Sequence, residues 1–565
     1  MSASLRRGLL PALLVLLALL PYLNSLSADF AFDDYGLVIE NPGRPRSALA
    51  AFRHGEAGGL YRPLTALTFM ANEAAGQGPF GYHLVNVVLH AATTLVAFAL
   101  ASLLLGGAPE ARVAAALFAV HPVHTEAVTN VAGRAEVLAA LLVLASLLVL
   151  AWSRGAARRH PIWPTLSAIL FAAALLAKES AFVTVGLAAL VSAWLERSTP
   201  RGVVRSVLPF VLLGGAYLLF RLAMFGVLTQ PKTPPVIDNP LAWVPLWPRV
   251  ATAIVVLWQY VSVLAVPLRL SSDDSLNQIP VVASALDLRL LLALGLFAAL
   301  VSALVALRRR APVLVFAGLF LAVSMAVTSN LALPIGAIKA ERFLYLPSFG
   351  WCLGCAWLLE RSVRSSGRRA LLVAAVLVAL AGRTWARNRD WQNNFSLFTA
   401  DVAASPNSAR ANSNAAAVYA QAGELFMAVY HYQRALAIFP QYATAAQGLA
   451  QAYELRGMDD AALHWYARAL KLDHRLPGAN LRRGGLLLKK GEPARAEVAF
   501  RAALRTDPDD ARLLVNLALA RLAQRDPDRA RALVARAESL LPSDPALREL
   551  VAGTKRVLAT ADAAR

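Results

Sequence analysis

Long apolar runs constrain this 565-residue chain more than any other feature of its sequence. A helix needs about 20 mostly apolar residues to cross the roughly 30 Å hydrocarbon core of a bilayer. Eleven runs near that length are predicted to cross as helices: 8–26, 84–105, 112–128, 134–152, 162–177, 180–196, 204–224, 287–307, 311–329, 343–360 and 370–383. With 58% hydrophobic residues and a mean hydropathy of +0.52, the chain has more apolar sequence than one soluble core can use. We therefore expect an all-α, polytopic membrane protein.

Basic residues gather in the short hydrophilic breaks between these runs and account for the net charge of +20. The clusters are Arg6 and Arg7; Arg154, Arg158 and Arg159; Arg197, Arg201 and Arg205; Arg308, Arg309 and Arg310; and Arg361, Arg364, Arg368 and Arg369. This positive-inside pattern makes nucleic-acid binding a poor explanation for the charge. If every cluster is cytoplasmic, the N-terminus is cytoplasmic, while residues 27–82 and the C-terminus lie outside. The alternative that 8–26 is a signal peptide stays open, because "SLRR" precedes its apolar core.

One further apolar segment, 249–268, is also long enough to cross a membrane. If it crossed, Arg308, Arg309 and Arg310 would lie outside and every later segment would be inverted. We expect it instead to lie in the outer interface or to re-enter, which leaves eleven crossings.

After the last apolar run the chain is Ala-rich, charged and repetitive, with a period of 34 residues. Equivalent positions are Gly423, Gly457, Gly491 and Arg525; Ala428, Ala462, Ala496 and Ala530; and Tyr432, Tyr466, Phe500 and Val534. This is the tetratricopeptide pattern, in which small residues lie where two antiparallel helices touch and a large residue fills the gap. Stacked repeats form an α-solenoid whose concave groove suits an extended polypeptide. Because such repeats are not a catalytic fold, chemistry is expected in the membrane half.

The predicted domains follow from this change of character. They are a transmembrane domain at 1–383, a connecting half-repeat helix at 384–408, a tetratricopeptide solenoid at 409–552 and a C-terminal tail at 553–565.

The outer loops of the membrane half carry polar residues that a plain anchor would not need. "AFDDYGLVIENPGRP" sets Asp33 and Asp34 directly after the first apolar run. The other outer polar residues are Arg62, His83, His90, His121, His124, Glu126, Arg134, Glu136, Lys178, Glu179, Lys339, Glu341, Arg342 and Tyr345. Ionisable groups at membrane depth are costly and are usually functional.

Arg62 and Arg342 are the best candidates for binding an anion, because a guanidinium grips phosphate in a bidentate way where a lipid phosphate would lie. Contact with bulk lipid headgroups is the competing interpretation. Lys178 with Glu179 is more simply explained as an ion pair at the end of a span. His121, His124 and Glu126 could hold a metal, but Pro122 interrupts the helix that would align them, so we expect no metal. Cys352 and Cys355 are interpreted as small packing residues.

These motifs together resemble one known family. "FDDYGLVIENP", "YRPLTALTF", "GPFGYHLVNVVLH", "HPVHTEAV", "GRAE", "KES", "LRLSSDDSLNQIP" and "AERFLYLPS", followed by the repeats, are similar to the transmembrane and tetratricopeptide-repeat containing family of protein O-mannosyltransferases. The resemblance implies a GT-C glycosyltransferase fold, an active site outside the membrane and a polyprenyl-phosphate sugar donor. It also implies that Asp33 or Asp34 is the catalytic base. The loop after the first run is short and the repeats are few, which leaves the choice of acceptor open.

The resemblance and the chemistry of sugar transfer together suggest roles for most of the outer polar residues. Arg342, Arg62, Lys178 and Arg134 are expected to bind the donor phosphate, and the pocket is expected to include His121, His124, Glu126, Glu136, Glu341 and Tyr345. A polyprenyl phosphate is a good leaving group, so transfer to a Ser or Thr hydroxyl needs a base for the proton and cations for the phosphate. One carboxylate suffices for a single inverting displacement, and we expect no cofactor. An Asp-rich turn with no catalytic role is the plainer alternative for "FDDYG".

Two other classes of protein stay open. A membrane-tethered scaffold would use the repeats to bind partners and the spans as an anchor. A flippase or polymerase of lipid-linked sugars would share the polar outer face. The expected partners of the enzyme are membrane lipid, a polyprenyl-phosphate sugar and protein acceptors bound by the solenoid.

Overall fold

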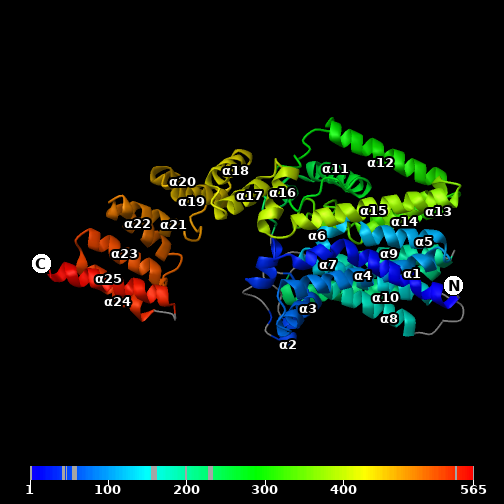
Figure 1. Cartoon of the computed structure of the whole chain (residues 1–565), viewed down its shortest axis with the longest axis horizontal. Helices are drawn as coiled ribbons and strands as arrows, with labels where there is room; N and C mark the ends of the chain where they lie inside the picture. The colour runs from blue at the N-terminus through cyan, green and yellow to red at the C-terminus, as the bar shows by residue number, and fades with distance from the viewer. Residues whose placement is uncertain are drawn as a thin grey trace. The chain divides into compact units, whose positions relative to one another are not determined.

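The computed structural model describes residues 3–40, 45, 47–53, 60–153, 162–196, 200–226, 233–540 and 544–563. These residues form helices and loops, with no strand among them, so the predicted all-α class is confirmed. The chain divides into two compact units, Met1–Pro406 and Asn407–Arg565 (Figure 1).

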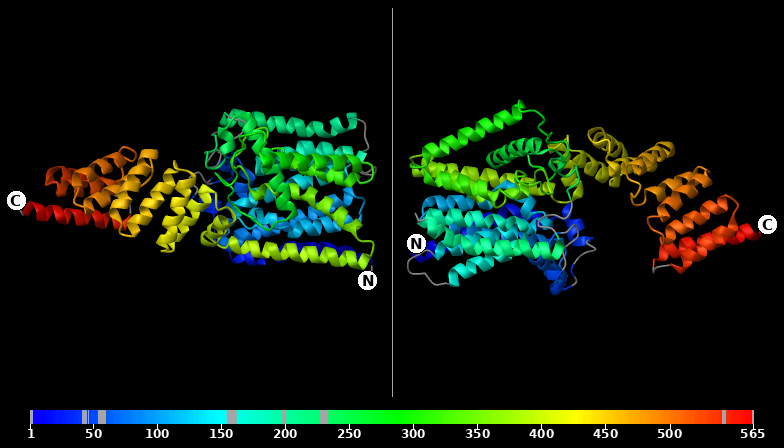
Figure 2. Two further views of the ribbon diagram at one scale, coloured as in Figure 1. Left: turned by 90° about the horizontal axis from the view of Figure 1, so that it is seen from above. Right: turned by 180° about the vertical axis from the view of Figure 1, so that it is seen from behind.

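The first unit is a bundle of helices that run roughly alongside one another (Figures 1 and 2). Its helices are α1 (Ala3–Leu19), α4 (Pro79–Leu104), α5 (Pro109–Val120), α7 (Arg134–Trp152), α8 (Ile162–Ala177), α9 (Thr184–Glu196), α10 (Pro200–Phe225), α13 (Pro312–Ser324), α14 (Pro347–Ser362) and α15 (Ser366–Asp390). Apolar side chains from α5, α7, α8 and α13 fill its core, with Phe118, Leu144, Phe171 and Phe320 all fully buried. Two further helices, α11 (Leu246–Ala265) and α12 (Leu288–Leu307), contact each other at its side.

Seven helices of the described part are long and apolar enough to cross a membrane. They are Leu9–Ser27, Pro79–Leu104, Val131–Ser153, Pro200–Phe225, Leu246–Ala265, Leu288–Leu307 and Ser366–Asp390. Ile162–Ala177, Glu179–Leu195 and Pro312–Ser324 are shorter apolar helices. The predicted polytopic helical bundle is therefore confirmed as a fold.

The predicted crossing at 112–128 is wrong in its extent. The α5 helix ends at Val120, and the chain then passes through a 3-10 turn, Pro122–His124, and the single helical turn α6 (Thr125–Val128). Pro122 lacks a backbone N–H and forces His121 before it into an extended conformation, at φ −71° and ψ 125°. The polar residues that follow therefore belong to a loop at the end of the bundle.

The α11 helix has both of its ends in contact with loops of the same end of the bundle. Arg249, near its start, donates to the carbonyl of Ala332 at 3.4 Å, and the carbonyl of Leu264, near its end, lies 3.1 Å from Nε2 of His121. The hydroxyl of Tyr260 also accepts the backbone N–H of Ala340 at 3.0 Å. A helix that crossed the bilayer would carry its two ends to opposite sides.

The described basic clusters lie at the other end of the bundle. Arg201 and Arg205 open α10, and Arg308, Arg309 and Arg310 lie between α12 and α13. The last cluster spans the end of α14 and the start of α15, and its Arg361 forms an ion pair with Glu110 at the start of α5. The clusters at 154–159 and at Arg197 lie outside the described residues.

Two further helices matter for the boundary of this unit. The α15 helix runs through the predicted boundary at residue 383 and ends at Asp390. The α16 helix (Asn394–Ala404) follows it and buries Leu397 and Asp401 within the first unit.

The second unit is a stack of helix pairs, as the 34-residue period predicts. The pairs are α17 (Ala409–Gln421) with α18 (Leu425–Ile438), α19 (Ala443–Leu455) with α20 (Asp459–Leu472), α21 (Ala479–Lys489) with α22 (Pro493–Leu504), and α23 (Ala511–Ala523) with α24 (Pro527–Ser539). A final helix, α25 (Pro545–Ala563), packs on α24 and spans the predicted boundary at 552.

The turn inside each pair explains one of the repeated positions. Gly423, Gly457 and Gly491 have φ between 73° and 82°, and Arg525, the equivalent residue of the fourth pair, has φ 62°. This left-handed conformation is costly for most residues and free for glycine, which is why three of the four positions carry it.

Candidate active site

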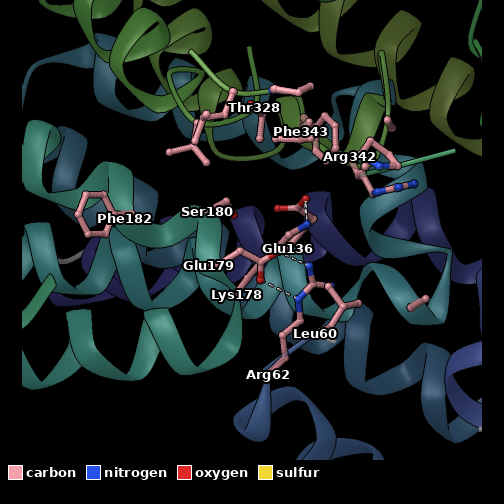
Figure 3. A pocket seen from close by; sticks show the side chains of 18 of the residues that line it. Leu60, Arg62, Glu136, Lys178, Glu179, Ser180, Phe182, Thr328, Arg342 and Phe343 are labelled. Atoms are coloured by element: carbon pink, nitrogen blue, oxygen red, sulfur yellow. Dashed lines mark hydrogen bonds and ion pairs between the residues drawn. The ribbon is translucent and has the colours of Figure 1, made fainter. Parts of the chain in front are cut away.

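A cavity of about 870 Å³ opens at the end of the bundle opposite the described basic clusters. Figure 3 shows side chains that line it. Its walls come from the segment after α1, the start of α7, the junction of α8 and α9, α10, the loop 326–337 and the residues before α14. Its ionisable lining residues are Asp33, Arg62, Glu136, Lys178, Glu179, Arg221 and Arg342. Apolar side chains such as Leu37, Phe182, Leu218 and Phe343 complete it.

The two adjacent acids after the first helix have different surroundings. Asp33 is partly exposed and lines the cavity. Asp34 is buried, and its carboxylate accepts the backbone N–H groups of Ala31 at 3.1 Å and Ala132 at 2.7 Å. Burial raises the pKa of Asp34 to about 7, against the lowering effect of these two donors. Asp33 can therefore meet a substrate, whereas Asp34 holds the loop against residue 132.

Arg62 lines the cavity from the residue before α3 (Pro63–Ala74). Its guanidinium binds the carboxylate of Glu179 in a bidentate way, with Nε–Oε2 at 3.0 Å and Nη2–Oε1 at 2.6 Å. Figure 3 shows these two side chains joined by dashed lines among the residues that line the cavity.

Lys178 is paired with Glu136, across 42 residues of sequence, and both line the cavity. The predicted pairing of Lys178 with Glu179 is therefore wrong. Lys178 has extended backbone, at φ −160° and ψ 137°, so neighbouring side chains diverge and Glu179 turns to Arg62 instead. Burial lowers the pKa of Lys178, while the charge of Glu136 opposes this effect.

Arg342 approaches the cavity from the side opposite Arg62 (Figure 3). Its side chain forms an ion pair with Glu126, and its backbone N–H donates to the other oxygen of the same carboxylate at 2.8 Å. Glu126 is fully buried and does not line the cavity itself. Burial alone would lower the pKa of Arg342, but the charges of Glu126 and Asp33 outweigh it and raise that pKa. The carboxylate of Asp33 therefore lies within electrostatic reach of this cation.

Arg134 is a predicted phosphate ligand that the structure places outside the cavity lining. Its side chain is fully buried and donates to Asn86 at 2.7 Å, to Asn72 at 2.6 Å and to the carbonyl of Tyr82 at 2.9 Å. The guanidinium also lies 4.6 Å from the centre of the Phe69 ring. These contacts join α3, α4 and α7, which indicates a packing role.

His121, His124 and Tyr345 also lie away from the cavity, in a buried aromatic cluster. Nε2 of His121 lies 3.1 Å from the carbonyl of Leu264, and Nε2 of His124 lies 2.7 Å from Oγ of Ser348. The Tyr345 hydroxyl lies 2.8 Å from Nδ1 of His90. This cluster packs α4, α5 and α14 together.

Glu341 faces a second polar cluster, behind Arg342. Its Oε1 accepts the backbone N–H of Ser271 at 2.6 Å. Nearby, Lys339 pairs with Asp274 at 2.6 Å, and Asp401 of α16 accepts the backbone N–H of Ser272 at 2.8 Å. Burial raises the pKa of Glu341 to about 8, against the opposing charge of Arg387. This cluster ties the loop 271–275 to the segment that carries Arg342.

Sequence reasoning missed several cavity residues. Asn130, Ser180, Tyr217 and Arg221 all line the cavity. Arg221 carried a usable signal, because it is an arginine inside an otherwise apolar run, "LLFRLAMF". Asn130 and Ser180 are short polar residues in loops and carried no distinct signal.

Fold and site together define a polytopic, all-helical membrane protein with a charged cavity at one end of its bundle and a tetratricopeptide solenoid. Residues 230–301 match the family described as "Protein O-mannosyl-transferase TMTC, DUF1736", and residues 487–553 match the tetratricopeptide repeat. The predicted resemblance to the transmembrane and tetratricopeptide-repeat containing family of protein O-mannosyltransferases is thus confirmed.

Individual relatives agree with this result. Protein O-mannosyl-transferase F38B6.6 of Caenorhabditis elegans is 29% identical over 454 residues, which cover 76% of this chain and 63% of the relative. Protein O-mannosyl-transferase TMTC3 of Homo sapiens is 26% identical over an alignment of 600 positions, which covers 90% of this chain and 65% of the relative. The chain thus spans just under two thirds of the length of these curated relatives. Among solved structures, YrrB, titled a TPR protein with an unusual peptide-binding site, covers 36% of this chain and 97% of its own, at 17% identity and a TM-score of 0.26.

Proposed function

We propose that this protein is a membrane glycosyltransferase that transfers a sugar from a polyprenyl-phosphate donor to Ser and Thr hydroxyls of proteins. The sugar is mannose, in keeping with the names of the relatives. The observation that carries the proposal is the cavity itself. It sets the carboxylate of Asp33 within reach of Arg342, and it holds Lys178 and Arg62 in the same space.

The chemistry requires one proton acceptor. The acceptor hydroxyl gives its proton to the carboxylate of Asp33 while its oxygen bonds to the anomeric carbon of the sugar. The bond between that carbon and the phosphate oxygen breaks, and the polyprenyl phosphate leaves with the electron pair. A single displacement of this kind inverts the anomeric centre.

The cations of the cavity suit the departing phosphate. Each of Arg342, Arg62 and Lys178 is fixed by a carboxylate, through Glu126, Glu179 and Glu136, so none has to reorganise when the phosphate gains charge. A guanidinium has five N–H donors, so Arg342 can bind Glu126 and a phosphate oxygen together. Because these side chains supply the positive charge, we propose that no cofactor takes part, and EDTA should leave the rate unchanged.

The proposed orientation places the cavity and the repeats outside the cytoplasm. The described basic clusters lie at the end of the bundle opposite the cavity, and basic residues next to spans favour the cytoplasmic side. The N-terminus is then cytoplasmic. The α15 helix ends at the cavity side, where Arg387 reaches the polar cluster around Asp401, so the following chain starts outside.

The solenoid is proposed to hold protein acceptors, because stacked repeats present an extended concave surface. The membrane unit would then perform the transfer and the repeats would select its targets. Removing the repeats should abolish modification of folded proteins and spare a short peptide.

The direct test is transfer by the purified full-length protein in liposomes. With polyprenyl-phosphate mannose and a Ser/Thr-rich peptide, mass spectrometry should show hexose added to the peptide, and a nucleotide-linked mannose should not replace the lipid donor. A chain ending at Pro406 keeps α16 and its buried Asp401, so it separates the role of the repeats from that of the membrane unit. Movement of the lipid-linked sugar across the bilayer without transfer would contradict the proposal and favour a flippase.

A further inference from the structure

Arg221 is a cation of the cavity that the proposed mechanism does not use. It lies near the end of α10, and its side chain is only 4% exposed. On the same helix Leu219, Leu222 and Met224 are exposed large apolar residues, which mark a face turned toward lipid. A buried arginine on a lipid-facing helix is costly unless it has an anionic or polar partner.

Arg221 ends a row of charged groups that crosses the cavity. At one end, the charge of Asp33 acts on Arg342, and that of Arg342 acts on Lys178. Lys178 in turn lies within electrostatic reach of Arg62 and Glu179.

The row continues through Tyr217 to Arg221. The charges of Glu179 and Arg62 act on the hydroxyl of Tyr217, and Nη1 of Arg221 donates to the same hydroxyl at 3.4 Å. Tyr217 and Arg221 are four residues apart on α10, so both side chains lie on one face of the helix. Tyr217 and Arg221 therefore line the same cavity as the Arg62–Glu179 ion pair.

Part of the cavity lining is apolar. Phe182 lines it from the turn before α9, Leu218 from α10, and Val327, Pro334 and Ile335 from the loop 326–337. An amphiphile that lay here would place its anionic group among the cations and its hydrocarbon chain along α10. A water-soluble sugar phosphate would gain nothing from these walls.

We propose that Arg221, with Tyr217, binds the phosphate of a prenyl phosphate at the lipid-facing end of the cavity, so that the isoprenoid chain leaves between α10 and the loop 326–337. This rests on the proposed function for the identity of the ligand. Because the donor has a single phosphate, which lies beside Arg342 and Asp33 during transfer, Arg221 binds the polyprenyl phosphate after its bond to the sugar has broken.

The test measures binding of farnesyl phosphate to the full-length protein in nanodiscs, without turnover. Arg221→Gln should weaken this binding by about 10- to 150-fold, the worth of a charge-assisted contact. Arg221→Lys keeps the positive charge but not the planar guanidinium group, so its affinity for farnesyl phosphate should fall less than that of Arg221→Gln. Arg205→Gln is the matched control, because Arg205 is an exposed arginine on the same helix at the opposite end. Unchanged farnesyl phosphate binding in a folded Arg221→Gln protein would overturn the proposal.

Two competition experiments test whether Arg221 recognises a prenyl phosphate or any phosphate group. Inorganic phosphate should compete poorly, and phosphatidic acid in the nanodisc should not compete. Equal competition by phosphatidic acid would overturn the proposal and make Arg221 a general headgroup contact.

If Arg221→Gln fails to fold, a photoreactive farnesyl phosphate should label residues 217–225 of the wild type. Labelling confined to other segments would overturn the proposal. Farnesyl phosphate binding that depends on Arg221 in a protein without mannose transfer would uphold this inference and reject the proposed function.

Discussion

Oδ1 of Asp34 accepts the backbone N–H of Ala132 at 2.7 Å, across 98 residues of sequence. The other carboxylate oxygen accepts the N–H of Ala31 at 3.1 Å, so this one side chain connects the loop after the first helix to the 3-10 turn just before α7. Its neighbour Asp33 is left facing the cavity. The two acids of the loop therefore have separate tasks, one in holding the site and one in lining it.

The first prediction concerns pH and stability. Burial raises the pKa of Asp34 from 3.8 to about 7, so the folded protein keeps a proton that the unfolded chain loses. The stabilisation is complete below about pH 3.8 and is lost as pH rises through about 7. Unfolding in detergent should therefore become easier over this window, and Asp34→Asn should reduce the dependence by up to about 1.4 kcal/mol per pH unit.

Other groups act in the same direction, because burial also raises the pKa of Asp401 to about 6 and of Glu341 to about 8. The slope should therefore shrink in the Asp34→Asn protein without vanishing. Asp29→Asn is the control, since Asp29 is exposed. An unchanged slope in Asp34→Asn would contradict the prediction.

The second prediction separates stability from donor binding at Arg342. Arg342→Gln leaves the buried carboxylate of Glu126 without its cation and should cost on the order of 3 kcal/mol of stability. The double variant Glu126→Gln/Arg342→Gln should recover most of that loss. Both proteins should still bind donor about 10- to 150-fold more weakly than the wild type. Normal donor affinity in the double variant would move the phosphate site away from Arg342.

The third prediction compares two adjacent glycines of the solenoid. A Cβ on Gly484 would overlap the ring of Phe500, whereas a Cβ on Gly485 would meet no atom within 4 Å. Gly484→Ala should therefore destabilise the α21–α22 pair by about 1–3 kcal/mol, and Gly485→Ala should stabilise it by up to about 1 kcal/mol. Hydrogen exchange of peptides from 479–504 measures both effects. Equal protection in the two variants would show that the packing of this pair is not as described.

The sequence predicted those features that depend on local periodicity. The apolar runs and the 34-residue repeat specify helices and their pairing, and Gly457 marks its turn through a conformation that other residues avoid. The sequence did not predict which residues form ion pairs across the fold. The sequence favours Glu179 as the partner of Lys178, but the partner is Glu136 on another helix, and nothing in the order of residues encodes which distant carboxylate comes close.

The end of the helix before Pro122 and the burial of Arg134 are two further features that the sequence did not predict correctly. Pro122 predicts a break in the helix, yet the apolar run continues past it to residue 128 and favours a longer crossing. Arg134 looked like a phosphate ligand because it is an arginine near a span, and only its contacts with Asn72 and Asn86 reveal a packing role. Arg221 could have been found, because a charge inside an apolar run is itself a signal.

The fourth prediction tests orientation. Gln441→Cys, at an exposed position of the solenoid, should react with a membrane-impermeant thiol reagent in intact cells. Ser366→Cys, at the exposed first residue of α15 on the basic end, should react only after lysis. The reverse pattern of labelling would invert the proposed topology.

The central claim is that the carboxylate of Asp33 accepts the proton of the acceptor hydroxyl. Asp33→Asn keeps the size of the side chain but cannot take a proton, so mannose transfer from polyprenyl-phosphate mannose to a Ser/Thr peptide should fall by about 10² to 10⁴. Donor binding should persist, and Asp29→Asn should transfer at the wild-type rate. Near-full transfer by Asp33→Asn, in a protein that binds donor normally, would contradict this assignment of the base.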